Sequence, residues 1–457
     1  MDTNMEDMSV HGFNKELFAE SKVVIPEKPL EFTAYPEQGL YNDALAWAVK
    51  KSNSIVDKFV GLGLVDVEDA AGFKIMSNES KITDSADVPN TSETEIDRPD
   101  QLRNRHHRIY KEIIENLGEA PEVGAEKMAD PQVLKLLEES RYLDQIADQT
   151  VRNQKDITVE FAGIGTVGCR AVEVISPVET EEEFNDRPLV IYIGGYGTEG
   201  ASIMPMMYEL PLNGLDVVGL GYPDSQSGVL TDKFAQQVEQ SSSLQAHAEL
   251  YKAVVKSYKE KYPGKPIQLW GQSTGALVIA DMLSDPEFSG EITEAVLIGS
   301  AGAMEMSPVK QAVEYVAEVG ALAGRIDRAP MYNYVVGLKN KPESAEEIEA
   351  KKQHDVLMNR VWGEVRARTC KRQSAYDTAR VAEGGNIFFV TGGKDKTTRD
   401  FERFNQESVK ENEKTGSNQW VVLHNKDGRH QDTNTMADLL VPQILNAKKK
   451  LQNDNLH

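Results

Sequence analysis

Residues 266–283, with the sequence PIQLWGQSTGALVIADML, carry the strongest signal for the fold of this chain. Its first five residues form an apolar run of strand length, and the apolar residues that follow Gly275 predict a helix. Between them lies a G-x-S-x-G motif with Ser273 at its centre. A strand that turns this sharply into a helix holds the serine in a strained backbone conformation, and the two glycines let strand and helix approach each other. The motif therefore predicts a serine hydroxyl that stands above the edge of a sheet.

Apolar runs of strand length flank this stretch on both sides. The runs predict a hairpin at 157–163 and 167–176 and further strands at 188–193, 215–220, 292–298, 386–390 and 419–423. Helical stretches separate most of these strands, which is typical of a mostly parallel α/β sheet with helices on both faces. Residues 302–382 interrupt the alternation with a long helical insertion, one helix of which opens with a capping box at Ser344 and Glu347. We expect this insertion to be a lid.

This arrangement resembles the α/β-hydrolase superfamily over about residues 156–448. The resemblance rests on the elbow around Ser273 and on an acid and a histidine that follow it in family order. It implies that Ser273 is the nucleophile of a serine hydrolase. Asp395, in a Gly-containing loop after the strand at 386–390, is the implied acid, with Glu305 in reserve. His430, in the loop after the last strand, is the implied base, and His424 at the end of that strand competes with it.

The loop Gly194-Gly195-Tyr196-Gly197 supports two different predictions. By resemblance, the backbone N–H groups of Tyr196 and Thr274 form the oxyanion hole. Gly195, Gly197 and Gly200 also match G-x-G-x-x-G between a strand and a helix, and Asp224 follows the next strand. A dinucleotide-binding oxidoreductase is thus one alternative, and a non-catalytic ligand-binding relative is another. The hydrolase is favoured because serine, acid and histidine occur together in the family order.

Residues 1–150 differ in character from the remainder. They are acidic, with helical periodicity at 40–60 and 101–117 and again from residue 131, and a polar linker near 77–100. No catalytic constellation occurs among them. We expect an independent helical unit or an oligomerisation element here, and a hydrolase domain with its lid over 151–457.

Charge and composition exclude several classes of protein. With 50 basic against 73 acidic residues, the 457-residue chain carries a formal charge of −23, which disfavours nucleic acid and anionic lipid as partners. Its only cysteines, Cys169 and Cys370, rule out a disulfide framework and a cysteine-based zinc cluster. The acidic N-terminus is unlike a secretory signal, and no apolar run approaches the roughly 20 residues of a membrane span. We expect a cytoplasmic enzyme without a cofactor or metal ion.

Two sets of side chains bear on the substrate, which we expect to be a small molecule with an acyl group. Methionines in or beside the insertion and after the Gly194 loop could form an apolar wall or fill helix packing: Met304, Met306, Met331, Met204, Met206 and Met207. A basic cluster in the insertion could read a carboxylate or form a solvated face: Arg366, Arg368, Lys371 and Arg372. Ester, thioester, amide and lactone substrates all suit this chemistry, by hydrolysis or by acyl transfer.

Overall fold

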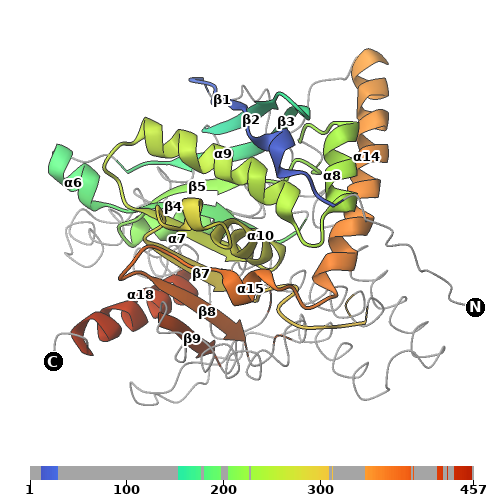
Figure 1. The fold of residues 1–457 in the computed structure, drawn as a ribbon. Helices are drawn as coiled ribbons and strands as arrows, with labels where there is room; N and C mark the ends of the chain where they lie inside the picture. Colours follow the sequence, from blue (N-terminus) through green and yellow to red (C-terminus); the bar gives the residue numbers. More distant parts are fainter. Residues whose placement is uncertain are drawn as a thin grey trace, which may run out of the picture.

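A computed structural model describes residues 12–28, 153–176, 180–196, 204–225, 228–307, 311, 345–392, 395, 419–425, 430 and 437–454. These ranges form one nine-stranded sheet with helices on both faces (Figure 1). The predicted N-terminal helices and the polar linker lie outside the described residues. None of the helices in the described ranges carries an apolar stretch long enough to cross a bilayer.

The sheet is mostly parallel, and its order is β1-β2-β3-β5-β4-β6-β7-β8-β9. The strands are β1 (Ser21–Val24), β2 (Gln154–Phe161), β3 (Gly165–Val174), β4 (Leu189–Ile193), β5 (Asp216–Leu220), β6 (Ile267–Gln272), β7 (Glu294–Ile298), β8 (Asn386–Gly392) and β9 (Gln419–Asn425). The first three pair antiparallel, as does β3 with β5, and all pairs from β5 to β9 are parallel. Every strand expected from the sequence is present, and the predicted α/β-hydrolase class of fold is confirmed.

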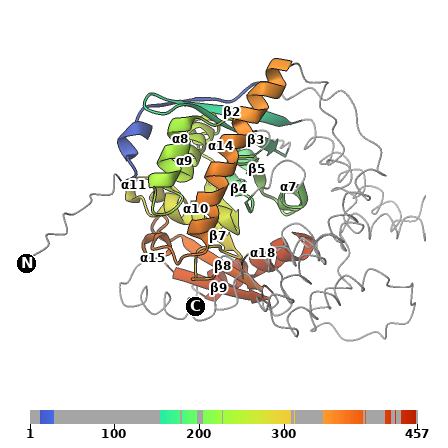
Figure 2. The same ribbon diagram turned by 90° about the vertical axis from the view of Figure 1, so that its right-hand side faces the viewer.

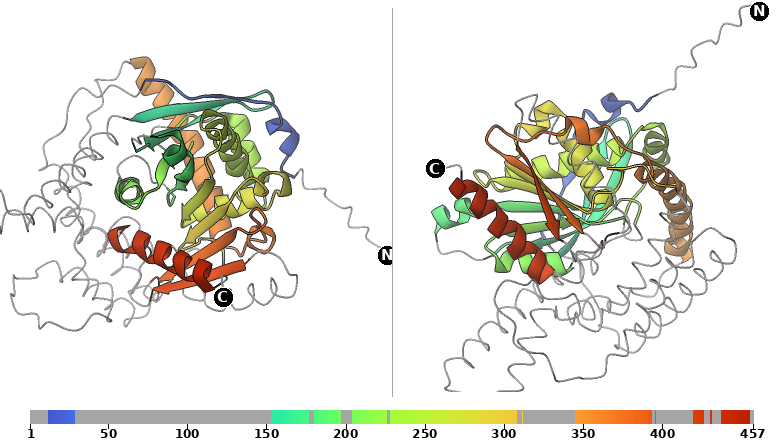
Figure 3. Two further views of the ribbon diagram at one scale, coloured as in Figure 1. Left: turned by 90° about the vertical axis from the view of Figure 1, so that its left-hand side faces the viewer. Right: turned by 90° about the horizontal axis from the view of Figure 1, so that it is seen from below.

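Helices cover the two faces of the sheet unequally (Figures 1 and 3). The described helices are η1 (Lys15–Phe18), α6 (Glu181–Asp186), α7 (Met204–Leu212), α8 (Asp232–Gln240), α9 (Gln245–Lys261), α10 (Thr274–Leu283), α11 (Pro286–Ser289), α14 (Ala345–Thr369), α15 (Ala375–Thr378) and α18 (Ala437–Asp454). Alternate residues of β4 separate the two cores: Ile191 packs with α8, α9 and α10, whereas Val190 packs with α7 and α18. Full burial of such a side chain contributes about 1.5–3 kcal/mol to folding.

The N-terminal segment 12–28 belongs to the sheet. Sequence reasoning places it in a separate helical region, but β1 pairs with β2 in the register Ser21 to Phe161. Phe18 of η1 is buried against Phe161, with ring centroids 5.1 Å apart. Lys15 reaches Asp285 at 2.8 Å. The sheet and its hydrophobic core therefore include residues on the N-terminal side of position 150.

The helix α14 crosses the edge of the sheet at which the parallel strands end (Figure 2). It begins at Ala345, directly after the predicted capping residue Ser344. Buried Val361 and Val365 face the core that also contains α10. Of the predicted insertion, residues 302–307, 311 and 345–382 are described, and α14 is their longest element.

Candidate active site

Ser273 lies in a strained elbow between β6 and α10. Its φ is 54° and its ψ is −116°, and it is the one non-glycine residue with positive φ in the described part of the chain. Such a backbone conformation costs on the order of 1–3 kcal/mol and persists only where the surroundings enforce it. A Cβ on Gly275 would lie 2.1 Å from the carbonyl oxygen of Ile193, which explains the second glycine of the motif. The conformation predicted from the motif is present.

Backbone hydrogen bonds align the elbow with the two neighbouring strand ends. The Ser273 N–H donates to the carbonyl oxygen of Ile298 at 2.8 Å, and the Gly299 N–H donates to that of Val390 at 2.9 Å. The ends of β6, β7 and β8 are thus held in one row. Ser273 itself is half-buried.

His430 and Asp395 meet beside this row. Nδ1 of His430 lies 3.0 Å from Oδ2 of Asp395, and the two side chains are 6% and 1% exposed. A Cβ on Gly299, whose φ is +52°, would lie 3.1 Å from each of these atoms. Gly299 directly follows Ile298, the residue that binds the Ser273 N–H. The acid and the base expected from the sequence therefore lie together, next to the strand end that supports the elbow.

Gln272 connects the histidine loop to the elbow. Its Nε2 donates to the carbonyl oxygen of His430 at 2.9 Å, and its side chain is buried. Gln272 is a variable position of the G-x-S-x-G motif, so its role gives no signal in the sequence. It fixes His430 relative to the neighbouring Ser273 through a contact that joins residues 158 positions apart.

The competing residues lie elsewhere. Nδ1 of His424 is 2.8 Å from the hydroxyl oxygen of Thr391 on the adjacent strand, and the His424 side chain is exposed. Glu305, the reserve acid, is exposed after β7. The structure pairs neither of them with Asp395 or His430 in the contacts of the described residues.

The loop after β4 passes close to the nucleophile. A Cβ on Gly195 would lie 3.4 Å from Cβ of Ser273. Tyr222, at the end of β5, donates its hydroxyl to the carbonyl oxygen of Gly194 at 2.9 Å. Its ring contacts that of Tyr196, with centroids 5.7 Å apart. Tyr222 therefore positions the loop from which the oxyanion-hole donor Tyr196 is expected, a role that the sequence does not indicate.

The rival nucleotide site is only partly described. Gly197 and Gly200 lie outside the described residues. Asp224, the carboxylate that would bind a ribose, is fully buried with its Oδ1 3.0 Å from Nε2 of His247, which is also fully buried. The pKa of Tyr196 is raised well above its usual range, first because its phenol is buried and second because the charge of Asp224 is close to it. Asp224 is thus buried and paired inside the protein, which argues against the dinucleotide prediction.

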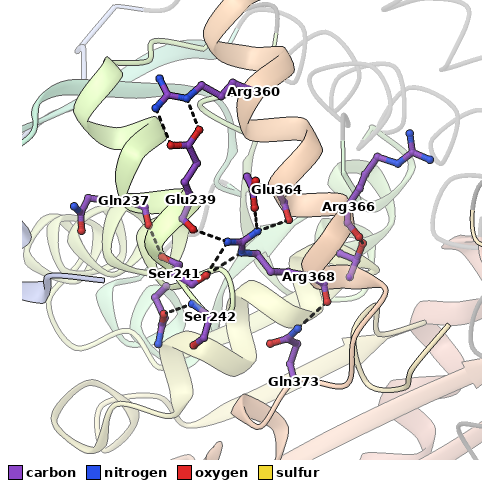
Figure 4. Close-up of polar contacts among 11 residues, drawn as sticks. Gln237, Glu239, Ser241, Ser242, Arg360, Glu364, Arg366, Arg368 and Gln373 are labelled. Carbon is purple, nitrogen blue, oxygen red and sulfur yellow. Dashed lines mark hydrogen bonds and ion pairs between the residues drawn. The ribbon is translucent and has the colours of Figure 1, made fainter. Parts of the chain in front are cut away.

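The helix α14 is bonded to the body along its length. Its Trp362 donates Nε1 to the carbonyl oxygen of Asp224 at 3.0 Å, and Nε2 of His354 lies 2.7 Å from that of Ser225. Near its end Arg368 donates to the carbonyl oxygen of Ser241 at 2.8 Å (Figure 4). The ring of Trp362 also contacts Tyr196, with centroids 5.1 Å apart. These contacts hold α14 against the body of the protein and against the ring of Tyr196.

The methionines divide into two groups. Met206 and Met207 are fully buried beneath the sheet, among residues of α18, and so fill the core. Met304 is half-buried against the opposite core, and Met306, also half-buried, donates its N–H to the carbonyl oxygen of Cys370. Met331 and the side chain of Met204 lie outside the described residues. Of the methionines whose side chains the structure describes, Met304 and Met306 are still candidates for the expected apolar wall.

A nine-stranded, mostly parallel sheet that presents a strained serine between strand and helix decides the fold. The chain has the α/β-hydrolase fold. Solved structures to which it is similar include a carboxylesterase of the thaumarchaeon Nitrososphaera gargenis, at 10% identity over 65% of this chain and 99% of that one (TM-score 0.40). A soluble variant of monoglyceride lipase from Saccharomyces cerevisiae is 14% identical over 64% and 92% (TM-score 0.40). An esterase from Pyrobaculum calidifontis is 17% identical over 75% and 95% (TM-score 0.39).

No protein-family model matches the chain, and no curated protein matches it. The chemistry of the site therefore rests on the chain's own residues.

Proposed function

We propose that the protein is a serine hydrolase that cleaves an ester or related acyl bond through an acyl-enzyme intermediate. The observation that carries this proposal is the strained backbone of Ser273, which has a φ of 54° and lies near the buried pair of His430 and Asp395. Such strain persists only where the surrounding structure enforces it, and a serine that served only as a helix cap would not require it. The elbow also gives no side-chain cap to α10.

The proposed roles follow from the geometry of the pair. Asp395 accepts a hydrogen bond from Nδ1–H of His430, which leaves Nε2 as the nitrogen that takes the proton of the Ser273 hydroxyl. The serine oxygen then attacks the carbonyl carbon, and the imidazolium formed is stabilised by the Asp395 charge. His430 then gives this proton to the leaving group, which departs and leaves the acyl group on Ser273. In the second half of the reaction, His430 takes a proton from water, and the water oxygen attacks the acyl-enzyme and releases the carboxylic acid.

The oxyanion of the tetrahedral intermediate needs fixed donors. We assign them to the backbone N–H groups of Tyr196 and Thr274, since the first follows Gly195 beside the nucleophile and the second opens α10 directly after it. The N-terminus of α10 adds a favourable dipole for the negative charge.

Covalent labelling tests this function. The wild-type chain should react with a fluorophosphonate probe at one residue and hydrolyse 4-nitrophenyl acetate, whereas Ser273→Ala should do neither. Ser284→Ala is the matched control, because that hydroxyl only bonds the carbonyl oxygen of Asp281 at the end of α10. Full esterase turnover by Ser273→Ala would refute the proposal.

The same experiment separates the alternatives. A dinucleotide-binding oxidoreductase would leave the probe unreacted and would copurify with nucleotide. A non-catalytic ligand-binding relative would show neither labelling nor nucleotide. The buried Asp224–His247 contact argues against the first, and the paired His430 and Asp395 argue against the second.

A further inference from the structure

The basic cluster at the end of α14 contains side chains in different situations. Arg368 is buried and donates to the carbonyl oxygens of Glu239 and Ser241 at 2.9 and 2.8 Å (Figure 4). Arg372 pairs with Asp377 at 2.6 Å. These two arginines hold the structure together, so a role in ligand binding does not fall to them.

Arg366 lies on the same helix as Arg368 but makes no comparable side-chain contact within the described residues. Its side chain is exposed and points away from the network around Arg368 (Figure 4). Within the described ranges, no hydrogen bond or ion pair joins its guanidinium to another residue, whereas its carbonyl oxygen accepts from Thr369 and Cys370. The chain has 73 acidic residues and a formal charge of −23, so an arginine without a carboxylate partner there is unexpected.

Two contacts place Arg366 at the catalytic edge of the sheet. One helical turn before it, Trp362 lies on the ring of Tyr196. Just after it, the carbonyl oxygen of Thr369 accepts from the N–H of Gly302 at 3.1 Å. Arg366 thus lies between the oxyanion loop and the segment after β7.

That segment leads directly to the nucleophile. The N–H of Ala301, the neighbour of Gly302, donates to the carbonyl oxygen of Ser273 at 3.1 Å. Burial raises the pKa of Tyr196 and the pKa of the Cys370 thiol. In both groups the positive charge of Arg366 acts in the opposite direction and lowers the pKa in part. The guanidinium is therefore close enough to both residues for its field to reach them.

We propose that Arg366 is a specificity residue that binds a carboxylate carried by the substrate, while Ser273 attacks the ester or thioester bond. The inference rests on the proposed function and names its substrate class. A guanidinium matches a carboxylate with two parallel hydrogen bonds. Because the net charge of the chain repels anions, a substrate with a free carboxylate needs such a local cation to remain at the site.

Matched pairs of a charged and a neutral ester test the inference. On the acyl side, 4-nitrophenyl hemiglutarate is compared with neutral 4-nitrophenyl pentanoate. On the leaving-group side, 4-acetoxybenzoate is compared with neutral 4-acetoxybenzamide. We expect the wild type to favour the anion in one of the pairs. Arg366→Gln should lower kcat/KM for that anion by roughly ten- to a hundredfold, mainly through KM, and change the neutral ester by less than about twofold.

Lys352→Gln is the matched control, since it removes the same charge from α14. Lys352 is exposed, pairs only with Glu349 in the described part of the chain, and lies about 21 Å from Arg366 along the helix. Lys371→Gln tests the exposed cation of the cluster that, unlike Arg372, makes no ion pair within the described ranges. Neither should approach the effect of Arg366→Gln, and Arg366→Lys should retain part of the preference.

The outcomes separate the inference from the function on which it rests. Equal use of both esters in each pair, or a larger loss in Lys371→Gln than in Arg366→Gln, overturns the role of Arg366 and leaves the hydrolase intact. Glutarate binding, measured by calorimetry, needs no turnover: Arg366→Gln should weaken it at least tenfold, and unchanged binding would reject the inference. Absence of hydrolysis and labelling in the wild type would instead refute the proposed function.

Discussion

Nδ1 of His430 and Oδ2 of Asp395 lie 3.0 Å apart, although 35 positions separate the two residues in the chain. The contact is buried and lies against Gly299, where any larger residue would push the two side chains away. A buried imidazole held by a carboxylate keeps one tautomer and one orientation. This is the condition that a general base must meet.

Loss of His430, the proposed general base, should abolish most of the activity. We expect His430→Ala to reduce kcat on 4-nitrophenyl acetate by several orders of magnitude, because only binding and the oxyanion hole would remain to lower the barrier. Asp395→Asn should give a smaller but still large loss, since it removes the carboxylate that orients the imidazole. The control is His424→Ala, which affects an exposed ring bonded to Thr391. If His424→Ala is inactive and His430→Ala is not, the base has been assigned to the wrong histidine.

The tyrosine that supports the oxyanion loop should influence catalysis more than stability. Tyr222→Phe removes the hydrogen bond to the carbonyl oxygen of Gly194, and we expect kcat to fall about tenfold while KM stays nearly constant. Tyr251→Phe is a matched control, because its hydroxyl is equally buried and donates to the carbonyl oxygen of Gly221 at 2.8 Å. Both variants should show similar losses in thermal stability. Equal losses of kcat in both would show that Tyr222 has no special relation to the site.

The N-terminal segment should contribute to the stability of the hydrophobic core. Phe18→Ala should lower the free energy of unfolding by about 3–5 kcal/mol, because the buried ring packs against Phe161 and Phe234. Phe13→Ala, which truncates a half-buried ring beside Phe18, should cost less. Denaturant unfolding measures both. A Phe18→Ala chain as stable as the wild type would show that the segment does not pack as described.

A buried carboxyl group on α10 should make stability depend on pH. Burial raises the pKa of Asp281 to about 7, although Ser243 and Leu244 each donate to its Oδ2 at 2.7 Å. The ordinary pKa of an aspartate in an unfolded chain is about 4, so the stabilisation is complete below about pH 4 and is lost as the pH rises through 7. The Asp281→Asn variant should therefore gain Tm relative to the wild type between pH 5 and pH 8.

Asp285 provides the control of opposite sign. Burial alone would raise its pKa, but hydrogen bonds from Lys15 and Lys252 hold it well below the usual range. Its stabilisation is present above about pH 4 and is lost only in more acidic solution. Asp285→Asn should thus show a constant Tm deficit from pH 5 to pH 8. A constant difference for Asp281→Asn as well would contradict the raised pKa.

The strands and the elbow were predictable from the sequence because each depends on local signals. A continuous apolar run can be satisfied only by a strand buried on both faces, as in β4, and the two glycines around Ser273 are demanded by close backbone contacts. The order of an acid and a histidine after the serine favoured Asp395 and His430, which the structure places together, and left Glu305 and His424 as alternatives.

The remaining features depend on contacts between distant residues. The strand β1 has only four residues, mostly exposed, so its pattern is too short to indicate a partner that begins 130 positions later. The hydrogen bonds of Gln272 and Tyr222 to backbone carbonyls leave no mark in the residue types. In the basic cluster, only the structure distinguishes the buried Arg368 from the exposed Arg366.

The pairing of β1 with β2 also defines where the chain leaves the sheet and where it returns. The two strands are antiparallel, with Val24 opposite Thr158, so the chain that leaves the end of β1 and the chain that enters β2 do so at the same corner. The strands β1 and β2 are therefore paired like the two arms of a hairpin, although 129 residues separate Val24 from Gln154 in the chain. The entropy of closing such a connection grows only slowly with its length, by about 0.6 kcal/mol for each doubling. Because that increase is small, a hairpin of this kind accepts a connection of almost any length without a change in the register of the two strands.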